Sequence, residues 1–390
     1  MKLAFIVQRC GKEIIGGAES LCLNLALKLS EYFEIEILTS CALDYMSWEN
    51  YYPSGVEKIN GITIRRFKTD FVRNVSKFNS ISDMVLVGHH SLDDEELWMK
   101  MQGPHCSGLI NFLKENKDNY DLFVFFTYLY ATTYYGLPIV ANKSILIPLA
   151  HDELPLKLSI YNKIFQNARG IIFHTEEEQK LIFNRFDIKK IKSKLIGYGV
   201  DELTDIPSGF SLKHDLAFPY LLYVGRIDES KGCDELISFF LKYNSENNSQ
   251  LKLVLVGPKV FEFKKNENIV HLGVLDEKEK SYVIRKSLIF VMPSRYESFS
   301  IATMEAWLAK KPVLVNAKSE VLKAHCEKSN GGLYYETYEE FVECINLFLS
   351  SMSLLKQMGE NGFDYVKHNY DWNNVINNYH NFIKELISKP

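Results

Sequence analysis

The segment that is most informative about the fold is residues 293–306, which read Pro293-Ser294-Arg295-Tyr296-Glu297-Ser298-Phe299-Ser300-Ile301-Ala302-Thr303-Met304-Glu305-Ala306. It follows an apolar, strand-like run at 288–292, and its second half has the pattern of a helix from Ile301 to Ala309. Where a strand turns into a helix, the first helical N–H groups point outward and attract anions. Two glutamates beside such a site predict hydrogen bonds from hydroxyl groups. The segment therefore indicates a ligand with hydroxyls and phosphates, as nucleotide sugars have.

The overall composition is that of an ordinary globular protein. The 390 residues are 46% hydrophobic and 24% charged, which predicts roughly two domains. A formal net charge of −4 argues against a nucleic-acid-binding protein. The seven cysteines are scattered and form no C-x-x-C pair, which favours reduced thiols in a cytoplasmic protein. The apolar run at 3–7 is too short for a signal peptide and predicts a first strand.

One uncharged segment, residues 122–142, is about long enough to span a bilayer. Its threonines and tyrosines would be unfavourable at the centre of a membrane. We therefore predict a buried strand at 122–126, a polar and aromatic loop, and a short helix, in preference to a membrane span.

Strands and helices alternate through both halves of the chain. The predicted strands are 3–7, 35–39, 122–126, 145–149, 170–173 and 194–196, then 220–224, 251–256, 269–272, 288–292 and 312–315. Helices are predicted at 18–30, near 234–243, at 301–309 and at 372–387. This alternation predicts an α/β protein with two doubly wound, Rossmann-like domains on parallel sheets. The break between them falls in residues 201–219, where Asp, Pro, Ser and Gly cluster.

Two glycine-containing loops are candidate phosphate sites. Gly16 and Gly17 lie between the first strand and the first helix, where a ligand can approach the backbone closely. Gly225 ends the strand at 220–224, and Arg226 and Lys231 follow with charges that suit a diphosphate. Ligands collect at this carboxyl edge of open parallel sheets. A flexible turn and a solvated loop are the alternatives.

Histidines also follow predicted strands. His151 comes after strand 145–149, where it could donate to a sugar hydroxyl or stabilise charge; a structural role is the alternative. His174 is a weaker candidate of the same kind. His89 and His90 lack the spacing of a compact metal site, so no bound metal is expected.

Taken in order, these motifs resemble glycosyltransferase family 4, a large family of retaining enzymes with the GT-B fold. The resemblance is carried by Gly16-Gly17-Ala18-Glu19, Gly199-Val200-Asp201, Gly225-Arg226, Lys231-Gly232, Val256-Gly257, Leu272-Gly273, Pro293-Ser294 and the pair Glu297 and Glu305. It implies two Rossmann-like domains facing across a cleft. Residues 1–205 would bind the acceptor and residues 206–372 the nucleotide sugar, and the C-terminal helix, 373–390, would cross back to the first domain.

The resemblance also implies residue roles. The catalytic residues would be Arg226 and Lys231, which grip the diphosphate, Glu297, which contacts hydroxyls of the donor sugar, and His151, near the transferred sugar. The nucleotide-binding residues would be Gly16, Gly17, Gly225, Gly273, Val274, Phe299, Ser300, Ile301 and Glu305. Among these, Glu305 would accept from the ribose, and Gly273 and Val274 would lie along the nucleobase.

The implied mechanism needs no metal and no cofactor besides the donor. Loss of the nucleoside diphosphate creates an oxocarbenium-like centre, and the two cations stabilise the leaving charge. The acceptor would attack from the leaving-group face, so neither glutamate needs to be the nucleophile, unlike in glycosidases. We expect a UDP-sugar in preference to a GDP-sugar, and hexosyl or N-acetylhexosaminyl transfer to a glycan or lipid-linked acceptor in surface polysaccharide or lipopolysaccharide biosynthesis.

The sequence departs from the family pattern in three places. Ser300 and Lys311 stand where the family usually has glycine, and residues 316–320 lack the common small residue–glycine pair. A small residue at 300 with its N–H available is expected to serve.

Residues 67–106 form a long, aromatic segment that we expect to be irregular and to shape the acceptor-binding site. Its basic residues, with those just before it, are Arg65, Arg66, Lys68, Arg73 and Lys77. Such a positive patch suits peripheral contact with the inner face of the cell membrane, and an ordinary solvated face is the alternative.

Three other readings are open. Sugar-nucleotide epimerases share this fold and cleave the same bond without an acceptor. A non-catalytic partner subunit would keep the fold, although the intact Arg226, Lys231, Glu297 and Glu305 disfavour it. A nicotinamide oxidoreductase is disfavoured because the G-x-G-x-x-G fingerprint is missing.

Overall fold

A computed structural model describes residues 1–14, 16–214 and 216–388. The chain divides into two compact units, residues 1–198 with the C-terminal segment from Asn373, and residues 199–372. The first unit thus ends at Tyr198, ahead of the segment in which the sequence predicts the break. Residues 389 and 390 of the predicted C-terminal helix lie outside the described part.

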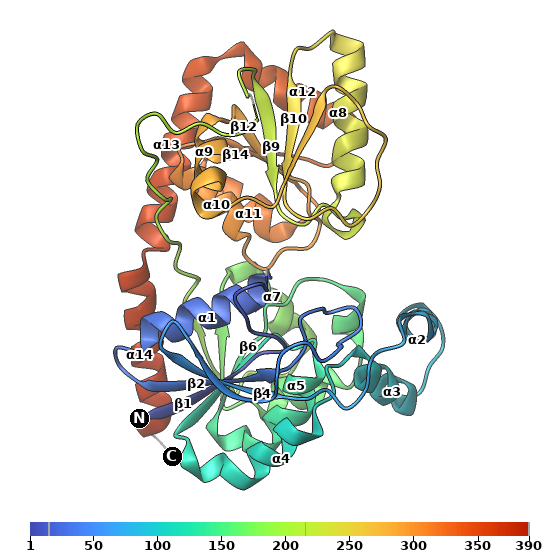
Figure 1. Ribbon diagram of the computed structural model, residues 1–390, viewed down its shortest axis with the longest axis vertical. Coiled ribbons are helices and arrows are strands. Elements are labelled where there is room, and N and C mark those ends of the chain that lie inside the picture. The colour runs from blue at the N-terminus through green and yellow to red at the C-terminus, as the bar shows by residue number, and fades with distance from the viewer. Residues whose placement is uncertain (15, 215, 389–390) are drawn as a thin grey trace. The chain divides into compact units, whose positions relative to one another are not determined.

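The first unit is built on an eight-stranded sheet in the order β3-β4-β2-β1-β5-β6-β7-β8. Strands β1, β2, β4 and β6 of this sheet are labelled in Figure 1. Its strands are β1 (Lys2–Ile6), β2 (Glu34–Ser40), β3 (Gly55–Ile59), β4 (Ile62–Phe67), β5 (Leu122–Phe126), β6 (Ser144–Ile147), β7 (Gly170–Phe173) and β8 (Lys192–Leu195). Neighbouring strands are parallel except β3 and β4. That pair forms an edge hairpin through Asn60 and Gly61, whose positive φ angles suit a tight turn.

The helices of this unit connect and cover the strands. They are α1 (Gly17–Leu29), α2 (Val75–Val87), α3 (Leu92–Gln102), α4 (Ser107–Asn116), α5 (Ala131–Gly136), α6 (Tyr161–Asn167), α7 (Glu176–Arg185) and most of α14 (Trp372–Ser388), with short 3₁₀ helices at 117–119, 137–143 and 154–157. Helix α14 packs closely on β7: a Cβ at Gly170 would lie 2.7 Å from the Leu386 side chain. Glycine at this position therefore lets the C-terminal helix dock.

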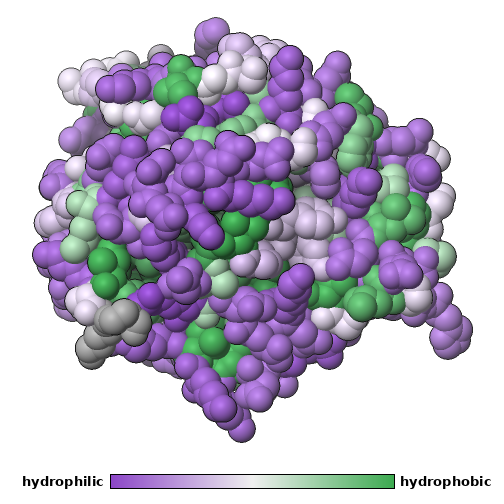
Figure 2. All heavy atoms as spheres, turned by 90° about the horizontal axis from the view of Figure 1, so that it is seen from below, coloured by the Kyte–Doolittle hydropathy of each residue, from purple (hydrophilic) through white to green (hydrophobic). Residues whose placement is uncertain are grey.

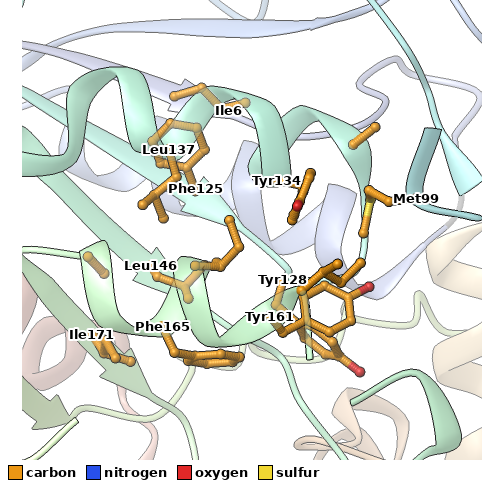
Figure 3. Close-up of a cluster of buried hydrophobic side chains, with 14 of the residues drawn as sticks. Ile6, Met99, Phe125, Tyr128, Tyr134, Leu137, Leu146, Tyr161, Phe165 and Ile171 are labelled. Carbon is orange, nitrogen blue, oxygen red and sulfur yellow. The ribbon is translucent and has the colours of Figure 1, made fainter. Parts of the chain in front are cut away.

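The core of the first unit lies between one face of the sheet and its covering helices. Figure 3 shows Phe125 of β5, Leu146 of β6 and Ile171 of β7 among aromatic side chains of the neighbouring helices. The rings of Tyr128 and Tyr161 meet edge to face, with centroids 4.7 Å apart. Because the central strands are covered on both sides, they are runs of apolar residues instead of alternating ones.

The second unit contains a six-stranded sheet in the order β11-β10-β9-β12-β13-β14, parallel throughout. Its strands are β9 (Tyr220–Val224), β10 (Lys252–Val256), β11 (Ile269–Gly273), β12 (Ile289–Met292), β13 (Val313–Asn316) and β14 (Gly332–Tyr335). Its helices are α8 (Cys233–Asn247), α9 (Glu277–Lys286), α10 (Ile301–Leu308), α11 (Glu320–Ser329), α12 (Tyr338–Ser350) and α13 (Met352–Asn369), with the 3₁₀ turn η4 (Glu229–Lys231). The predicted fold class, two doubly wound α/β domains, is therefore confirmed.

Residues 67–106 are more regular than the sequence analysis expected, because they contain α2 and α3. Both helices have side-chain caps. Asn74 accepts the N–H of Lys77, and Ser91 and Asp94 form a reciprocal capping box. These caps are visible in the sequence as helix-start signals, and the aromatic composition obscured them.

The predicted positive patch is smaller than expected, because two of its five basic residues are buried. Arg66 and Arg73 are only 3% and 7% exposed. Arg66 pairs with Glu57 and donates to the carbonyl of Cys10, whereas Arg73 donates to the carbonyls of Met46 and Tyr45. Arginine is long enough to bury its stem while its planar head satisfies backbone acceptors, so these charges stabilise the loops of the first unit.

The uncharged segment 122–142 forms β5, α5 and part of a 3₁₀ helix, as predicted. Within the described residues, no helix combines the length and the apolar character that crossing a bilayer requires. Figure 2 shows one face of the molecule, where hydrophilic side chains surround several separate apolar groups, a pattern that is common on protein surfaces.

Candidate functional site

The candidate site of the second unit lies at the carboxyl edge of its sheet. Gly225 follows β9 and Gly257 follows β10, with φ angles of 156° and 132°. A Cβ at Gly257 would lie only 1.9 Å from the carbonyl oxygen of Gly225. The two loops are therefore in direct backbone contact, which needs glycine at 257 and fixes the start of the loop that carries Arg226.

Arg226 is oriented by the residues that follow it. Its Nε lies 2.8 Å from Oδ2 of Asp228, and an Nη lies 3.4 Å from Oγ of Ser230. Burial raises the pKa of Asp228, but hydrogen bonds from Ser230 and the charge of Arg226 outweigh burial and hold this pKa below its ordinary value. Asp228 is thus ionised at neutral pH and holds the guanidinium at the sheet edge.

Lys231 makes the central contact of the site. Its Nζ lies 2.7 Å from Oε1 of Glu297, and the two side chains are 32% and 14% exposed. Gly232, in the left-handed conformation with φ 73°, joins η4 to α8, and a Cβ there would lie 2.5 Å from the carbonyl oxygen of Pro293. The Lys-Gly pair therefore rests against the loop that carries Glu297.

The loop from Pro293 to Ser300 is held by a buried aromatic residue. The ring of Phe299 meets those of Tyr370 and His325 edge to face, at 4.8 and 5.6 Å between centroids. Ser300 then caps α10 with φ 69°, a left-handed conformation that glycine adopts most easily. This φ is a physical reason for glycine at this position, and Ser300 tolerates it with its Oγ 2.9 Å from Oγ1 of Thr303.

Glu305 lies on α10 and is paired with Lys280 of α9. Lys280 Nζ is 2.9 Å from Oε1 of Glu305 and 2.9 Å from Oε2 of Glu277. Burial lowers the pKa of Lys280, but the two carboxylates outweigh burial and raise this pKa above its ordinary value. Burial raises the pKa of Glu305 above its ordinary value, and the charge and hydrogen bond of Lys280 reduce that shift without cancelling it. The ammonium therefore stays charged and favours the ionised form of Glu305.

The end of β11, the third strand at this edge, carries an exposed apolar side chain. Gly273 ends β11 with φ 72°, and its carbonyl accepts the N–H of Gly257 at 2.8 Å. The next side chain, Val274, is 59% exposed. An exposed apolar side chain beside a backbone turn can contact a planar ring.

The first unit carries its own candidate residues. Gly16 is the N-cap of α1 and Gly17 its first residue. A buried ion pair lies beside them: Arg9 Nη2 is 2.6 Å from Oε1 of Glu19. A Cβ at Gly16 would come within 2.3 Å of the Glu19 carboxylate, whereas one at Gly17 would meet nothing within 4 Å.

His151 follows β6 in a turn that is fixed by a buried carboxylate. Leu149, two residues earlier, has φ 54°. Glu178 accepts the N–H of Ala150 at 2.8 Å and that of His174 at 2.9 Å. His151 Nδ1 lies 3.6 Å from Glu153, which in turn accepts the hydroxyl of Tyr128. Non-glycine residues with positive φ are frequent at functional sites, so this turn is a candidate for presenting His151.

His174, the weaker candidate, has a structural position. It is 2% exposed, and its Nε2 lies 3.0 Å from the hydroxyl of Tyr379 on α14. Burial lowers the pKa of His174 to about 3. A neutral, buried imidazole that contacts the C-terminal helix fits packing better than ligand binding.

The structure thus places Arg226, Lys231 and Glu297 on adjoining loops of one sheet edge and joins Glu305 to a residue that the sequence did not single out. Gly16, Gly17 and His151 belong to the first unit. The sequence analysis missed Asp228, Lys280 and Glu178. Asp228 lies between Arg226 and Lys231, which the sequence analysis did single out, and could have been found there. Lys280 and Glu178 act across elements, which a local pattern cannot reveal.

The potential metal ligands and the thiols of the chain are dispersed. Among residues 1–14, 16–214 and 216–388, no group of three or more His, Cys, Asp or Glu side chains could hold a metal ion. His90 instead lies 3.0 Å from Glu95. The seven cysteines are free thiols, and all but Cys344 are buried.

Comparison with known proteins gives a family for part of the chain. Residues 209–365, which lie within the second unit, match the family described as glycosyl transferases group 1. The chain is 34% identical over 99 residues to an uncharacterized 41.2 kDa protein in the cps region of Klebsiella pneumoniae, covering 25% of this chain and 27% of that protein. It is 24% identical over 207 residues to an alpha-1,3/1,6-mannosyltransferase of Dictyostelium discoideum, covering 53% and 45%. The chain thus spans less than half the length of these two curated relatives.

Solved structures share the fold over the full chain. A sucrose-phosphate synthase from Thermosynechococcus elongatus superposes with a TM-score of 0.73 at 16% identity, covering 100% of both chains. The Anabaena protein HepE, solved in complex with UDP and glucose, gives 0.67 at 14% identity, covering 98% of this chain and 99% of that one. The shared architecture is that of the GT-B fold, and the family match lies within the second unit.

Proposed function

We propose that this protein is a retaining glycosyltransferase of family 4 that moves a sugar from a nucleotide-diphosphate sugar to a hydroxyl of its acceptor. The observation that carries the proposal is the pair of Lys231 and Glu297, 2.7 Å apart, on the sheet edge that also bears Arg226. Two cations at such an edge, each paired with a carboxylate, match the phosphates and hydroxyls of a nucleotide sugar.

Each residue has a role in the proposed reaction. Arg226 and Lys231 bind the diphosphate and stabilise the charge that develops as it leaves, with a well-placed group contributing about 3–4 kcal/mol. Glu297 accepts hydrogen bonds from the donor sugar, and its contact with Lys231 couples sugar recognition to the leaving group. The N–H groups from Phe299 to Ile301, at the start of α10, bind phosphate oxygens.

The nucleoside is bound by other residues of the same unit. Glu305 accepts from ribose hydroxyls, and Gly225, Gly273 and Val274 line the route to the base. In the first unit, the backbone at Gly16 and Gly17 approaches the phosphates. His151 donates a hydrogen bond to the transferred sugar or stabilises its charge. No metal and no further cofactor takes part, because the two cations supply the positive charge.

For the donor we favour a UDP-sugar over a GDP-sugar, because HepE, which shares the fold, was solved in complex with UDP and glucose. A hexosyl or N-acetylhexosaminyl group would be transferred to a glycan or lipid-linked acceptor. The relative in the cps region of Klebsiella pneumoniae favours surface polysaccharide biosynthesis. Such an enzyme would work in the cytoplasm, with peripheral contact to the inner membrane face when the acceptor is a lipid.

The test is a thermal-shift screen of the purified chain against UDP-, GDP- and ADP-sugars, because a ligand that binds the native state raises the melting temperature. Donors that bind are then incubated with and without candidate acceptors. Sugar transfer with release of nucleoside diphosphate is the expected result. Conversion of the donor in the absence of acceptor would indicate an epimerase instead, and binding of no donor would indicate a non-catalytic subunit.

A further inference from the structure

Lys280 is a partly buried cation at the place proposed for the nucleoside. Its side chain is 17% exposed, equal to that of its partner Glu305, whereas Glu277 is 74% exposed. Removing a lysine from water costs free energy unless carboxylates compensate for the lost hydration. Lys280 is therefore held at this position chiefly by Glu305, the better buried of its two partners.

The backbone on both sides of this contact is fixed. Asp276 and Glu279 form a capping box that sets the first turn of α9, where Lys280 lies. Glu305 is on α10, whose start is anchored by the buried Phe299. Because both helices begin at defined positions, the distance of 2.9 Å between Nζ and Oε1 belongs to the architecture of the unit.

The contact is one-sided. Hydrogen bonding to Lys280 is through Oε1 of Glu305, and a carboxylate has two oxygens with about four lone-pair positions. A lysine on one oxygen favours the ionised form of the group and fixes its plane. The other oxygen keeps its capacity to accept, which a pair of vicinal hydroxyls needs.

We propose that Lys280 is a positioning residue for nucleotide binding: it holds one oxygen of the Glu305 carboxylate so that the group accepts hydrogen bonds from the ribose hydroxyls. The inference rests on the proposed function, since it assigns Lys280 to the ribose end of the same site. In the competing role, the ammonium of Lys280 blocks the Glu305 carboxylate, and a nucleotide has to displace the ammonium before it can bind.

The test measures affinity for UDP, with GDP in parallel, by calorimetry on the full chain. Lys280→Met removes the ammonium with little change in length. Lys278→Met makes the same charge change on the same helix at an exposed position and is the matched control. Lys280→Arg keeps a cation, and Glu305→Gln removes the carboxylate. Melting temperatures establish that each variant is folded.

We expect Lys280→Met to weaken binding about tenfold, as for loss of a hydrogen bond to a charged group. Lys278→Met should match the wild type, and Lys280→Arg should recover part of the loss. In the Glu305→Gln background, adding Lys280→Met should change affinity by less than about twofold, because the two residues act as one unit. A purely structural lysine would lower the melting temperature and leave affinity unchanged.

Equal or tighter binding by Lys280→Met overturns the inference and, if tighter, indicates competition for Glu305. A full tenfold loss in the Glu305→Gln background overturns it too, because Lys280 would then act without Glu305. If Lys280→Met does not fold, the affinity of Lys280→Arg is compared with that of Glu305→Gln instead. An affinity of Lys280→Arg no higher than that of Glu305→Gln would then overturn the inference. Wild-type protein that binds neither nucleotide rejects the proposed function, and the inference falls with it.

Discussion

At the scale of single residues, Lys231 is the most direct test of the proposed chemistry. Replacing it with alanine should reduce the rate of sugar transfer at least about 100-fold, the cost of one lost electrostatic contact in a transition state. Its side chain is 32% exposed, so folding should persist. The measurement is turnover at saturating donor.

Lys265→Ala, a change at an exposed lysine of the same unit, is the control for Lys231→Ala and should keep normal turnover. Near-normal turnover of Lys231→Ala would remove the leaving-group role from this residue.

Ser300 tests the backbone at the start of α10. With φ 69°, a left-handed conformation disfavours side chains with a Cβ by roughly 1–2 kcal/mol. Ser300→Gly relieves this cost but loses the contact with Thr303 and gains unfolded-state entropy, so stability should change by less than about 1 kcal/mol.

Ser300→Val is the informative partner of that variant. A β-branched residue is a poor fit to a positive φ, and we expect a loss of at least about 2 kcal/mol. Urea unfolding of the two variants decides the point: equal stabilities would mean that the position does not require a left-handed backbone.

At the scale of elements, the start of α1 offers a matched pair of glycines. Gly16→Ala would place a Cβ against the Glu19 carboxylate, which is tied to Arg9, and should cost about 1–3 kcal/mol as overpacking does. Gly17→Ala enters open space on the first helical residue and should stabilise by about 0.5–1 kcal/mol.

Melting temperatures of the two alanine variants should therefore move in opposite directions. Gly17→Ala is the control for the general effect of a methyl group in this loop. Equal shifts would show that Glu19 moves aside readily and that the ion pair with Arg9 does not constrain the turn.

The elements also show which sequence signals were sufficient. Strand 220–224 is observed at the predicted bounds because an apolar run ending in Gly-Arg has a single good environment, a central parallel strand. The region 67–106 was misjudged because its helix caps are short signals within an aromatic composition. Arg66 and Arg73 were misjudged because a charged side chain says nothing about its burial until its acceptors are known.

At the scale of the whole molecule, each unit buries a histidine, and both should make the protein sensitive to acid. Burial lowers the pKa values of His174 and His325 to about 3, from an ordinary 6.5. The unfolded chain then binds protons first as the pH falls. The stabilisation is complete above about pH 6.5 and is lost toward pH 3, by about 1.4 kcal/mol per pH unit for each histidine.

The measurement is urea unfolding at pH 7.5 and pH 5.5. The stability gap between the wild type and His325→Gln should shrink by about 1.4 kcal/mol at the lower pH, and likewise for His174→Gln.

Glu178 acts with the opposite sign, because burial raises its pKa from 4.5 to about 7. The stabilisation from protonated Glu178 is complete below pH 4.5 and is lost as the pH rises through 7. The difference in free energy of unfolding between the wild type and Glu178→Gln should therefore be larger at pH 5.5 than at pH 7.5.

The proposed reaction as a whole should not need a divalent metal. Sugar transfer should continue at an unchanged rate in excess EDTA, because Arg226 and Lys231 supply the positive charge. Added Mg²⁺ or Mn²⁺ after dialysis is the control. A requirement for either ion, restored by its addition, would contradict the metal-free scheme.

By itself, the sequence determined the alternation of strands and helices, the two-domain α/β class, the positions of Arg226, Lys231 and Glu297 in loops that follow strands, and that of Glu305 within a helix. These follow from local periodicity and from glycines, which act over a few residues. Only the tertiary structure decided how side chains pair: Lys231 with Glu297, Lys280 with Glu305, and Arg66 and Arg73 with buried acceptors. Such pairs join residues that lie far apart in the chain, and their energies depend on burial, which appears only when the sheets and helices have packed.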